Sequence, residues 1–132
     1  KKSSLPLIGD GWINQAELRE GIKDFISNVK NEYSPKWLSP KRLDIYIPSH
    51  KLAIEYHGQQ HYEAVDFFGG REAFEKRVAD DKIKKDLCLK NNLSFVEWPY
   101  LVEVNEKNIS KMIDYAQKNK EKKFFINMKD LI

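Results

Sequence analysis

The sequence predicts an α/β domain in which helices flank a mixed β-sheet, and three observations lead to this fold class. Its 132 residues are enough for one hydrophobic core and too few for two. Two segments with helical spacing of apolar residues enclose two short runs rich in β-branched and aromatic residues. A last short apolar run follows the second helical segment and returns the chain to the sheet. We therefore expect residues 1–132 to form a single domain.

The composition indicates a globular protein and leaves its partners open. Hydrophobic residues make up 41% of the chain and charged residues 33%, which is not the low hydrophobicity of a disordered protein. The 23 Lys and Arg residues against 20 Asp and Glu give a net charge of only +3. A basic surface for nucleic acid would therefore have to arise from the placement of charges rather than from their total.

Cysteine content and hydropathy predict a protein of a reducing, intracellular compartment. A single cysteine, Cys88, excludes an internal disulfide and a thiolate zinc framework, and we expect it to be a small apolar core residue. No apolar run approaches the roughly 20 residues that span a bilayer, so we expect no membrane association. Because the chain does not begin with methionine, it is compatible with a domain cut from a longer protein.

The first helix is predicted from about Gln15 to Val29, with Asn14 as its cap, after a turn-rich entry over residues 5–11. Its apolar face is formed by residues at helical spacing: Leu18, Ile22, Phe25, Ile26 and Val29. Residues 31–40 contain two prolines and predict a loop with a possible short strand.

Residues 42–47 and 51–57 predict a β-hairpin. If Ser49 and His50 form the turn, Ile47 pairs with Leu52 and Asp44 lies directly opposite Glu55. The two carboxylates then share one face of the sheet. The other face is expected to be apolar: Leu43, Ile45, Ile47, Leu52, Ile54 and Tyr56.

Two facing carboxylates repel one another, and burial disfavours their ionisation, so a compensating charge is expected. A divalent cation with hard oxygen ligands, such as Mg²⁺, would provide it. The alternative is a structural ion pair of Asp44 or Glu55 with Arg42, Lys41 or a lysine of a helix.

The segment after the hairpin is rich in polar groups. Gly58 allows the chain to bend and to bring Gln60 and His61 back toward the carboxylates. His57 and His61 are spaced like a His-x-x-x-His zinc pair, but such a pair requires a helix, and a strand ending at Gly58 argues against zinc. Phe67 and Phe68 are read as core residues, with base stacking as the alternative.

A second helix is predicted from about residue 71 to 91 and carries Asp81, and a buried strand follows at 94–98. Apolar residues between Ile109 and Ala116 then predict a docking helix, followed by a charged turn over 118–123 and a last apolar strand or anchor from Phe124.

Several segments in this order resemble the PD-(D/E)XK nuclease superfamily, in particular very-short-patch-repair endonucleases and phage homing endonucleases with an EDxHD motif. The resemblance covers about residues 12–100 and implies a restriction-endonuclease-like core, with residues 101–132 as a C-terminal helical extension. The segments that carry it are Pro35–Leu38, Leu43–Pro48, Ile54–Tyr62, Phe68–Gly70, Asp81–Cys88 and Trp98–Tyr100.

The resemblance implies a site residue by residue. Asp44 and Glu55 would hold Mg²⁺, with Mn²⁺ able to substitute. Gln60 and His61 match the next element, in which His61 would accept a proton or contact phosphate, and Asp81 matches the final aspartate on the following helix. Carboxylates with a neutral histidine suit phosphodiester hydrolysis.

Two positions depart from the family pattern. His57 stands where the family has lysine, and Gln15 stands where a glutamate of the first helix is expected. Glu17 is near Gln15, but it lies about 200° away around the helix.

The sequence thus predicts a Mg²⁺-dependent DNA endonuclease that nicks or cuts both strands, in the cytoplasm of a bacterial or phage-infected cell. Two alternatives stay open, a catalytically impaired nuclease-fold module for DNA binding or assembly, and a metal-dependent RNA nuclease. Further domains of a longer protein could supply target specificity.

Basic residues that flank the expected site in sequence are candidates for DNA contact, since Lys and Arg bind phosphates independently of sequence. Lys84 and Lys85 share a helix face with Asp81 and are expected at the rim of the cleft, unless they are solvated or pair with Asp80 and Asp86. The full set is Lys36, Lys41, Arg42, Arg77, Lys84 and Lys85.

Overall fold

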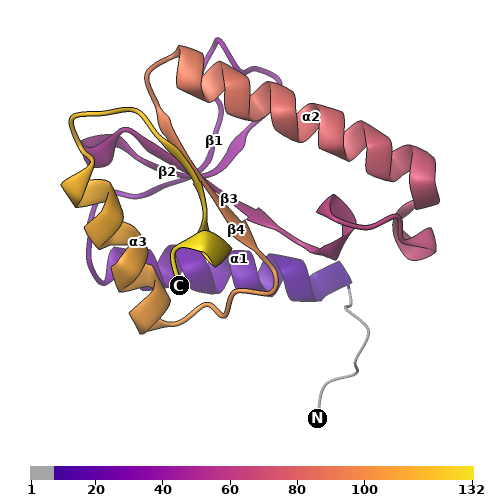
Figure 1. The fold of residues 1–132 in the computed structure, drawn as a ribbon, viewed down its shortest axis with the longest axis horizontal. Coiled ribbons are helices and arrows are strands. Elements are labelled where there is room, and N and C mark those ends of the chain that lie inside the picture. The colour runs from indigo at the N-terminus through magenta and orange to yellow at the C-terminus, as the bar shows by residue number, and fades with distance from the viewer. Residues whose placement is uncertain (1–7) are drawn as a thin grey trace.

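The computed structural model describes residues 8–132, without the side chains of residues 8–13 and Phe67. It is an α/β fold built on a five-stranded mixed sheet, as predicted (Figure 1). The strands follow the order β1-β2-β3-β4-β5, in which β1, β2 and β3 pair antiparallel and β3, β4 and β5 pair parallel. The elements are α1 (Ile8–Lys23), β1 (Lys30–Tyr33), β2 (Leu43–Ile47), β3 (Leu52–His57), α2 (Gly70–Lys90), β4 (Ser94–Pro99), α3 (Glu106–Lys118) and β5 (Phe125–Asn127).

The helices cover both faces of the sheet, with α1 and α3 on one face and α2 on the other (Figure 1). The larger core cluster joins α1 and α3 to the sheet through residues such as Leu18, Ile109 and Trp98. The smaller cluster joins α2 to the sheet and contains Cys88, which is buried as predicted. It also contains Leu43, which sequence alternation had placed on the other face. Because both faces are covered, every residue of β3 is buried.

The predicted hairpin register is confirmed. Ile47 pairs with Leu52 and Ile45 with Ile54. The connection is longer than the expected two residues, because a 3₁₀ turn over Pro48–His50 precedes Lys51. Lys51 has a φ of 48° and donates its backbone N–H to the carbonyl oxygen of Pro48 at 3.1 Å.

The bounds predicted for the first helix were wrong. Helix α1 begins at Ile8 and ends at Lys23, so Asn14 lies inside it and is not its cap. The Nδ2 of Asn14 donates instead to the Tyr56 hydroxyl at 3.0 Å. Of the turn predicted over residues 5–11, residues 5–7 lie outside the described part of the chain, and residues 8–11 are helical. Beyond Lys23, Ile26 packs on the core from an irregular segment, which explains why apolar spacing continues past the helix end.

The remaining elements agree closely with expectation. The possible strand in the proline-rich region is β1, and α2 and β4 begin and end within one residue of their predicted bounds. Residues 101–132 contribute α3 and also β5, which extends the sheet beside β4. No helix between residues 8 and 132 is long and apolar enough to cross a membrane.

Candidate functional site

Acidic residues of neighbouring strands lie in one row across the sheet. Glu55 on β3 is the register partner of Glu97 on β4. The confirmed hairpin register places Asp44 opposite Glu55, and the pairing of β1 with β2 places Glu32 opposite Asp44. Acidic positions of four adjacent strands therefore meet at one level of the sheet.

Asp44 and Glu55 are held together at the end of the backbone pairing of β2 with β3, next to the pair Ile45 and Ile54. The backbone N–H of Asp44 donates to Glu55 Oε2 at 2.7 Å. The backbone N–H of Tyr56 donates to Asp44 Oδ2 at 3.0 Å. The two side chains thus take up backbone donors of the opposite strand, and this fixes the carboxylates side by side.

Lys84 on α2 supplies the charge nearest to this pair. Its Nζ lies 2.8 Å from Glu55 Oε1, and both side chains are largely buried. The sequence had placed Lys84 at the cleft rim as a phosphate contact. The structure instead gives it a position inside the domain, which matches the alternative of an ion pair between Glu55 and a helix lysine.

Burial makes both carboxyl groups weak acids. Burial, together with the charge of Glu55, raises the pKa of Asp44 from 3.8 to about 7, although Lys84 opposes this shift. Burial likewise raises the pKa of Glu55, against the opposing effects of Lys84 and the Asp44 backbone N–H. Even with Lys84 beside them, the protonated forms of both carboxyls are therefore favoured relative to free carboxylic acids.

This raised pKa predicts a pH dependence of stability. A carboxyl whose pKa is higher in the folded state stabilises the fold while it is protonated, and that contribution is lost as pH rises. For Asp44 the loss falls between about pH 4 and pH 7. We expect the free energy of unfolding, measured with urea, to fall from pH 5 to pH 8 in the wild type. In Asp44→Asn the fall should be smaller, and an identical fall in both proteins would contradict the pKa assigned to Asp44.

A second group of polar side chains adjoins the carboxylate pair on the α2 face. His61 Nδ1 lies 2.7 Å from Asp81 Oδ2, and His57 Nε2 lies 3.9 Å from Asp81 Oδ1. His57 Nδ1 faces Glu97 Oε2 at 3.4 Å. The two imidazole rings are stacked, with centroids 4.1 Å apart and an interplanar angle of 3°. We call His57, His61 and Asp81 the histidine–aspartate cluster.

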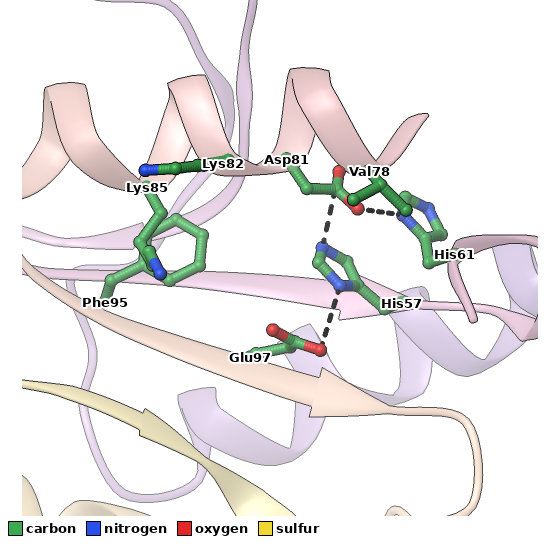
Figure 2. A pocket seen from close by; sticks show the side chains of 8 residues that line it. All are labelled: His57, His61, Val78, Asp81, Lys82, Lys85, Phe95 and Glu97. Atoms are coloured by element: carbon green, nitrogen blue, oxygen red, sulfur yellow. Dashed lines mark hydrogen bonds and ion pairs between the residues drawn. The ribbon is translucent and has the colours of Figure 1, made fainter. Parts of the chain in front are cut away.

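The histidine–aspartate cluster opens into a pocket, shown in Figure 2. Strand β3 provides its buried floor at His57, the 3₁₀ turn Gln59–His61 provides His61, and α2 provides Asp81. The remaining lining residues are Val78, Lys82, Lys85, Phe95 and Glu97.

Gln60 is beside this site but is held locally. A Cβ at Gly58 would lie 2.7 Å from Gln60 Oε1, so the glycine permits the Gln60 side chain to fold back over the backbone. No described contact joins Gln60 to Asp44 or Glu55. The sequence grouped Gln60 with His61, but only His61 reaches Asp81.

The basic candidates for DNA contact are dispersed. Lys36 and Arg42 are exposed. Arg77 donates to the Phe68 carbonyl oxygen at 2.6 Å, Lys41 pairs with Asp80 at 3.7 Å, and Lys85 Nζ lies 4.5 Å from the Phe125 ring centroid. Arg77 therefore anchors the loop before α2, a local role that the sequence did not predict.

Two acidic residues of the site were missed by sequence reasoning. Glu32 accepts a hydrogen bond from Gln15 Nε2 at 3.1 Å, so the helix position that lacks the expected glutamate contacts a glutamate of β1. Glu97 accepts a hydrogen bond from the hydroxyl of Tyr62, and it also faces His57. The sequence could have indicated Glu97, because it is a polar residue between the buried Val96 and Trp98. Nothing in the sequence pointed to Glu32, which lies in a short strand with a φ of 52°.

Comparison with known proteins finds uncharacterized viral relatives, and it does not assign a function. No protein-family profile matches the chain. The uncharacterized protein 307L of Invertebrate iridescent virus 6 is 39% identical over 62 residues, 46% of this chain and 32% of that protein. The uncharacterized protein 094L of Frog virus 3 is 41% identical over 73 residues, 54% of this chain and 47% of that protein. The chain thus spans a third to a half of the length of these relatives.

Proposed function

We propose that this protein is a divalent-metal-dependent DNA endonuclease that hydrolyses phosphodiester bonds. The observation that carries the proposal is the pair of facing carboxylates, Asp44 and Glu55, fixed by backbone donors next to Lys84 and the histidine–aspartate cluster. This set combines hard oxygen ligands, a cation and a histidine, which suit phosphodiester hydrolysis.

The donor set fits Mg²⁺ or Mn²⁺. The backbone donors use Asp44 Oδ2 and Glu55 Oε2, and no described group donates to Asp44 Oδ1. Asp44 Oδ1 would hold the ion, and Glu55 Oε1 would join it once the Lys84 ammonium, 2.8 Å from that oxygen, moves aside. A cation there would stabilise the ionised form of both acids. When bound, such an ion polarises the phosphodiester and activates water.

The other polar residues can take the remaining roles. Asp81 holds the ring of His61 through Nδ1, which leaves Nε2 to accept a proton from the attacking water. Lys84 places a positive charge beside Glu55. It can thereby replace the lysine that the nuclease family has at the position of His57.

The order of the elements also supports the proposal. Asp44 and Glu55 lie on consecutive strands β2 and β3, and Asp81 lies on the following helix α2. This is the arrangement that the resemblance to PD-(D/E)XK nucleases implied.

A second candidate function is a nuclease-fold module that binds DNA or assembles with other domains without cleaving. The Lys84–Glu55 ion pair favours it, because Lys84 compensates Glu55 without a metal. Affinity for Mg²⁺ separates the two candidates. In either case we infer action in the cytoplasm of a virus-infected cell, with further domains of a longer protein supplying target specificity.

Incubation of the protein with supercoiled plasmid, linear duplex and RNA, each with Mg²⁺ or EDTA, tests the proposed function. We expect the plasmid and the duplex to be cleaved with Mg²⁺ only, and the RNA to stay intact. Cleavage of RNA alone would move the substrate class to RNA. Intact substrates in every reaction would favour the non-cleaving module.

We expect His61→Ala to lower the single-turnover cleavage rate by about 10²–10⁴-fold, because loss of a general base has effects of this size. Affinity for the duplex should change much less. His50→Ala is the matched control, since His50 lies in the hairpin turn and bonds Ser49 and Gln117. A wild-type rate in His61→Ala would assign His61 a structural role.

A further inference from the structure

The histidine–aspartate cluster has the composition and spacing of a site for a second, softer cation. One ligand atom each from His57, His61 and Asp81 lies within 4.8 Å of the other two. The sequence argued against zinc because two histidines four apart need a helix to converge. A strand end followed by a 3₁₀ turn achieves the same convergence, and it stacks the two rings.

We propose that His57, His61 and Asp81 bind a borderline divalent cation such as Zn²⁺ or Co²⁺. Two imidazole nitrogens and one carboxylate are a donor set that favours these ions over Mg²⁺, which prefers oxygen. Three protein ligands leave the fourth position of a tetrahedral ion to water, and the cluster opens into the pocket of Figure 2.

The ligand atoms are close to the required separation. Tetrahedral ligands at zinc distances are about 3.3 Å apart. His61 Nδ1 lies 2.7 Å from Asp81 Oδ2 and His57 Nε2 lies 3.9 Å from Asp81 Oδ1, so the carboxylate would turn slightly to offer one oxygen to the ion. His57 is fixed, with its side chain only 5% exposed, whereas those of His61 and Asp81 are 20% and 27% exposed and have room to adjust.

The surroundings of the cluster suit a cation. Glu97 faces the Nδ1 of His57 at 3.4 Å, so an outer carboxylate directs Nε2 of this ring toward Asp81 (Figure 2). The two lysines that line the pocket are engaged elsewhere: Lys82 pairs with Asp86 at 2.8 Å, and Lys85 lies over Phe125. Both ammonium groups are therefore held by partners outside the histidine–aspartate cluster.

This inference does not rest on the proposed function, because ion binding is measurable in a protein that cleaves nothing. It does constrain that function. The ion would replace the proton shared by His61 and Asp81, so His61 could not serve as proton acceptor while the ion is bound.

Calorimetric titration of the full chain with ZnCl₂, and with CoCl₂ followed by visible absorption, tests the site. We expect one ion per chain with the absorption of a tetrahedral cobalt site. His61→Ala and Asp81→Asn should each weaken binding by at least about tenfold, and Glu97→Gln by about tenfold. His50→Ala should bind like the wild type. Circular dichroism checks that each variant is folded.

Three results would overturn the proposal. The first is a wild-type protein that binds neither ion. The second is unchanged affinity in His61→Ala and Asp81→Asn. The third is an equal loss in His50→Ala, which would indicate adventitious binding to surface histidines. If a ligand variant does not fold, Glu97→Gln decides, because it keeps all three ligands. Weaker binding in Glu97→Gln supports the site, and unchanged binding overturns it.

Discussion

Replacing Lys84 with methionine is expected to lower the free energy of unfolding by about 3–5 kcal/mol at pH 8, because it breaks a buried ion pair by removing one partner. The Lys84 ammonium lies 2.8 Å from Glu55 Oε1 and compensates a carboxylate that is 5% exposed. Methionine has a similar length without the charge, so Glu55 would lose its positive partner beside Asp44. Urea unfolding of both proteins measures the difference.

Two controls separate charge compensation from packing. The double variant Lys84→Met with Glu55→Gln should regain most of the lost stability, because no charge is then left unpaired. Lys82→Met removes an exposed pair with Asp86 on the same helix and should cost less than about 1 kcal/mol. Equal costs for Lys84→Met and Lys82→Met would contradict the role assigned to the Lys84–Glu55 pair.

Asp44→Asn is expected to remove Mg²⁺-dependent cleavage while the fold stays intact. A metal ligand contributes to several kcal/mol of transition-state stabilisation, and its loss therefore corresponds to a rate decrease of about a thousandfold or more. Stability at neutral pH should hold or rise, because the substitution keeps the volume and removes the repulsion with Glu55. Single-turnover cleavage of a duplex and urea unfolding are measured on the same preparation.

The outcome for Asp44→Asn can contradict the account in two ways. Cleavage at the wild-type rate with Mg²⁺ would exclude Asp44 as a metal ligand. An unfolded variant would show that Asp44 is needed for the fold, through its bond from the Tyr56 backbone, rather than for chemistry.

The hairpin was the best-predicted part of the fold because its register depends on a short-range pattern. Alternation of buried residues admits few pairings, since a slip of one residue moves every side chain to the other face. Ile47 therefore pairs with Leu52 even though the turn differs from the expected one. Leu43 was placed wrongly because it lies at the strand end, where it packs with the α2 side of the core.

The ends of the first helix were not predictable from spacing alone. Ile26 and Val29 continue the apolar pattern after Lys23, but they pack on the core from an irregular segment. Asn14 resembled a cap in sequence, and only the position of Tyr56 on β3 explains its side chain.

The facing carboxylates were predictable, and the partners that complete the site were not. Lys84 and Lys85 are consecutive on α2, so their side chains differ by about 100° around the helix. Packing on the sheet, which periodicity does not encode, turns Lys84 toward Glu55 and leaves Lys85 beside Phe125. Convergence of His57 with His61 was missed because it depends on the turn after Gly58.

The central claim is that Asp44 and Glu55 together hold a divalent cation of the Mg²⁺ class. Calorimetric titration of MgCl₂ into the wild type, Asp44→Asn and His61→Ala, without DNA, tests it most directly. The account predicts Mg²⁺ binding that His61→Ala keeps and that Asp44→Asn weakens by at least about tenfold. Equal Mg²⁺ affinity in the wild type and Asp44→Asn, or no binding to either, would contradict it.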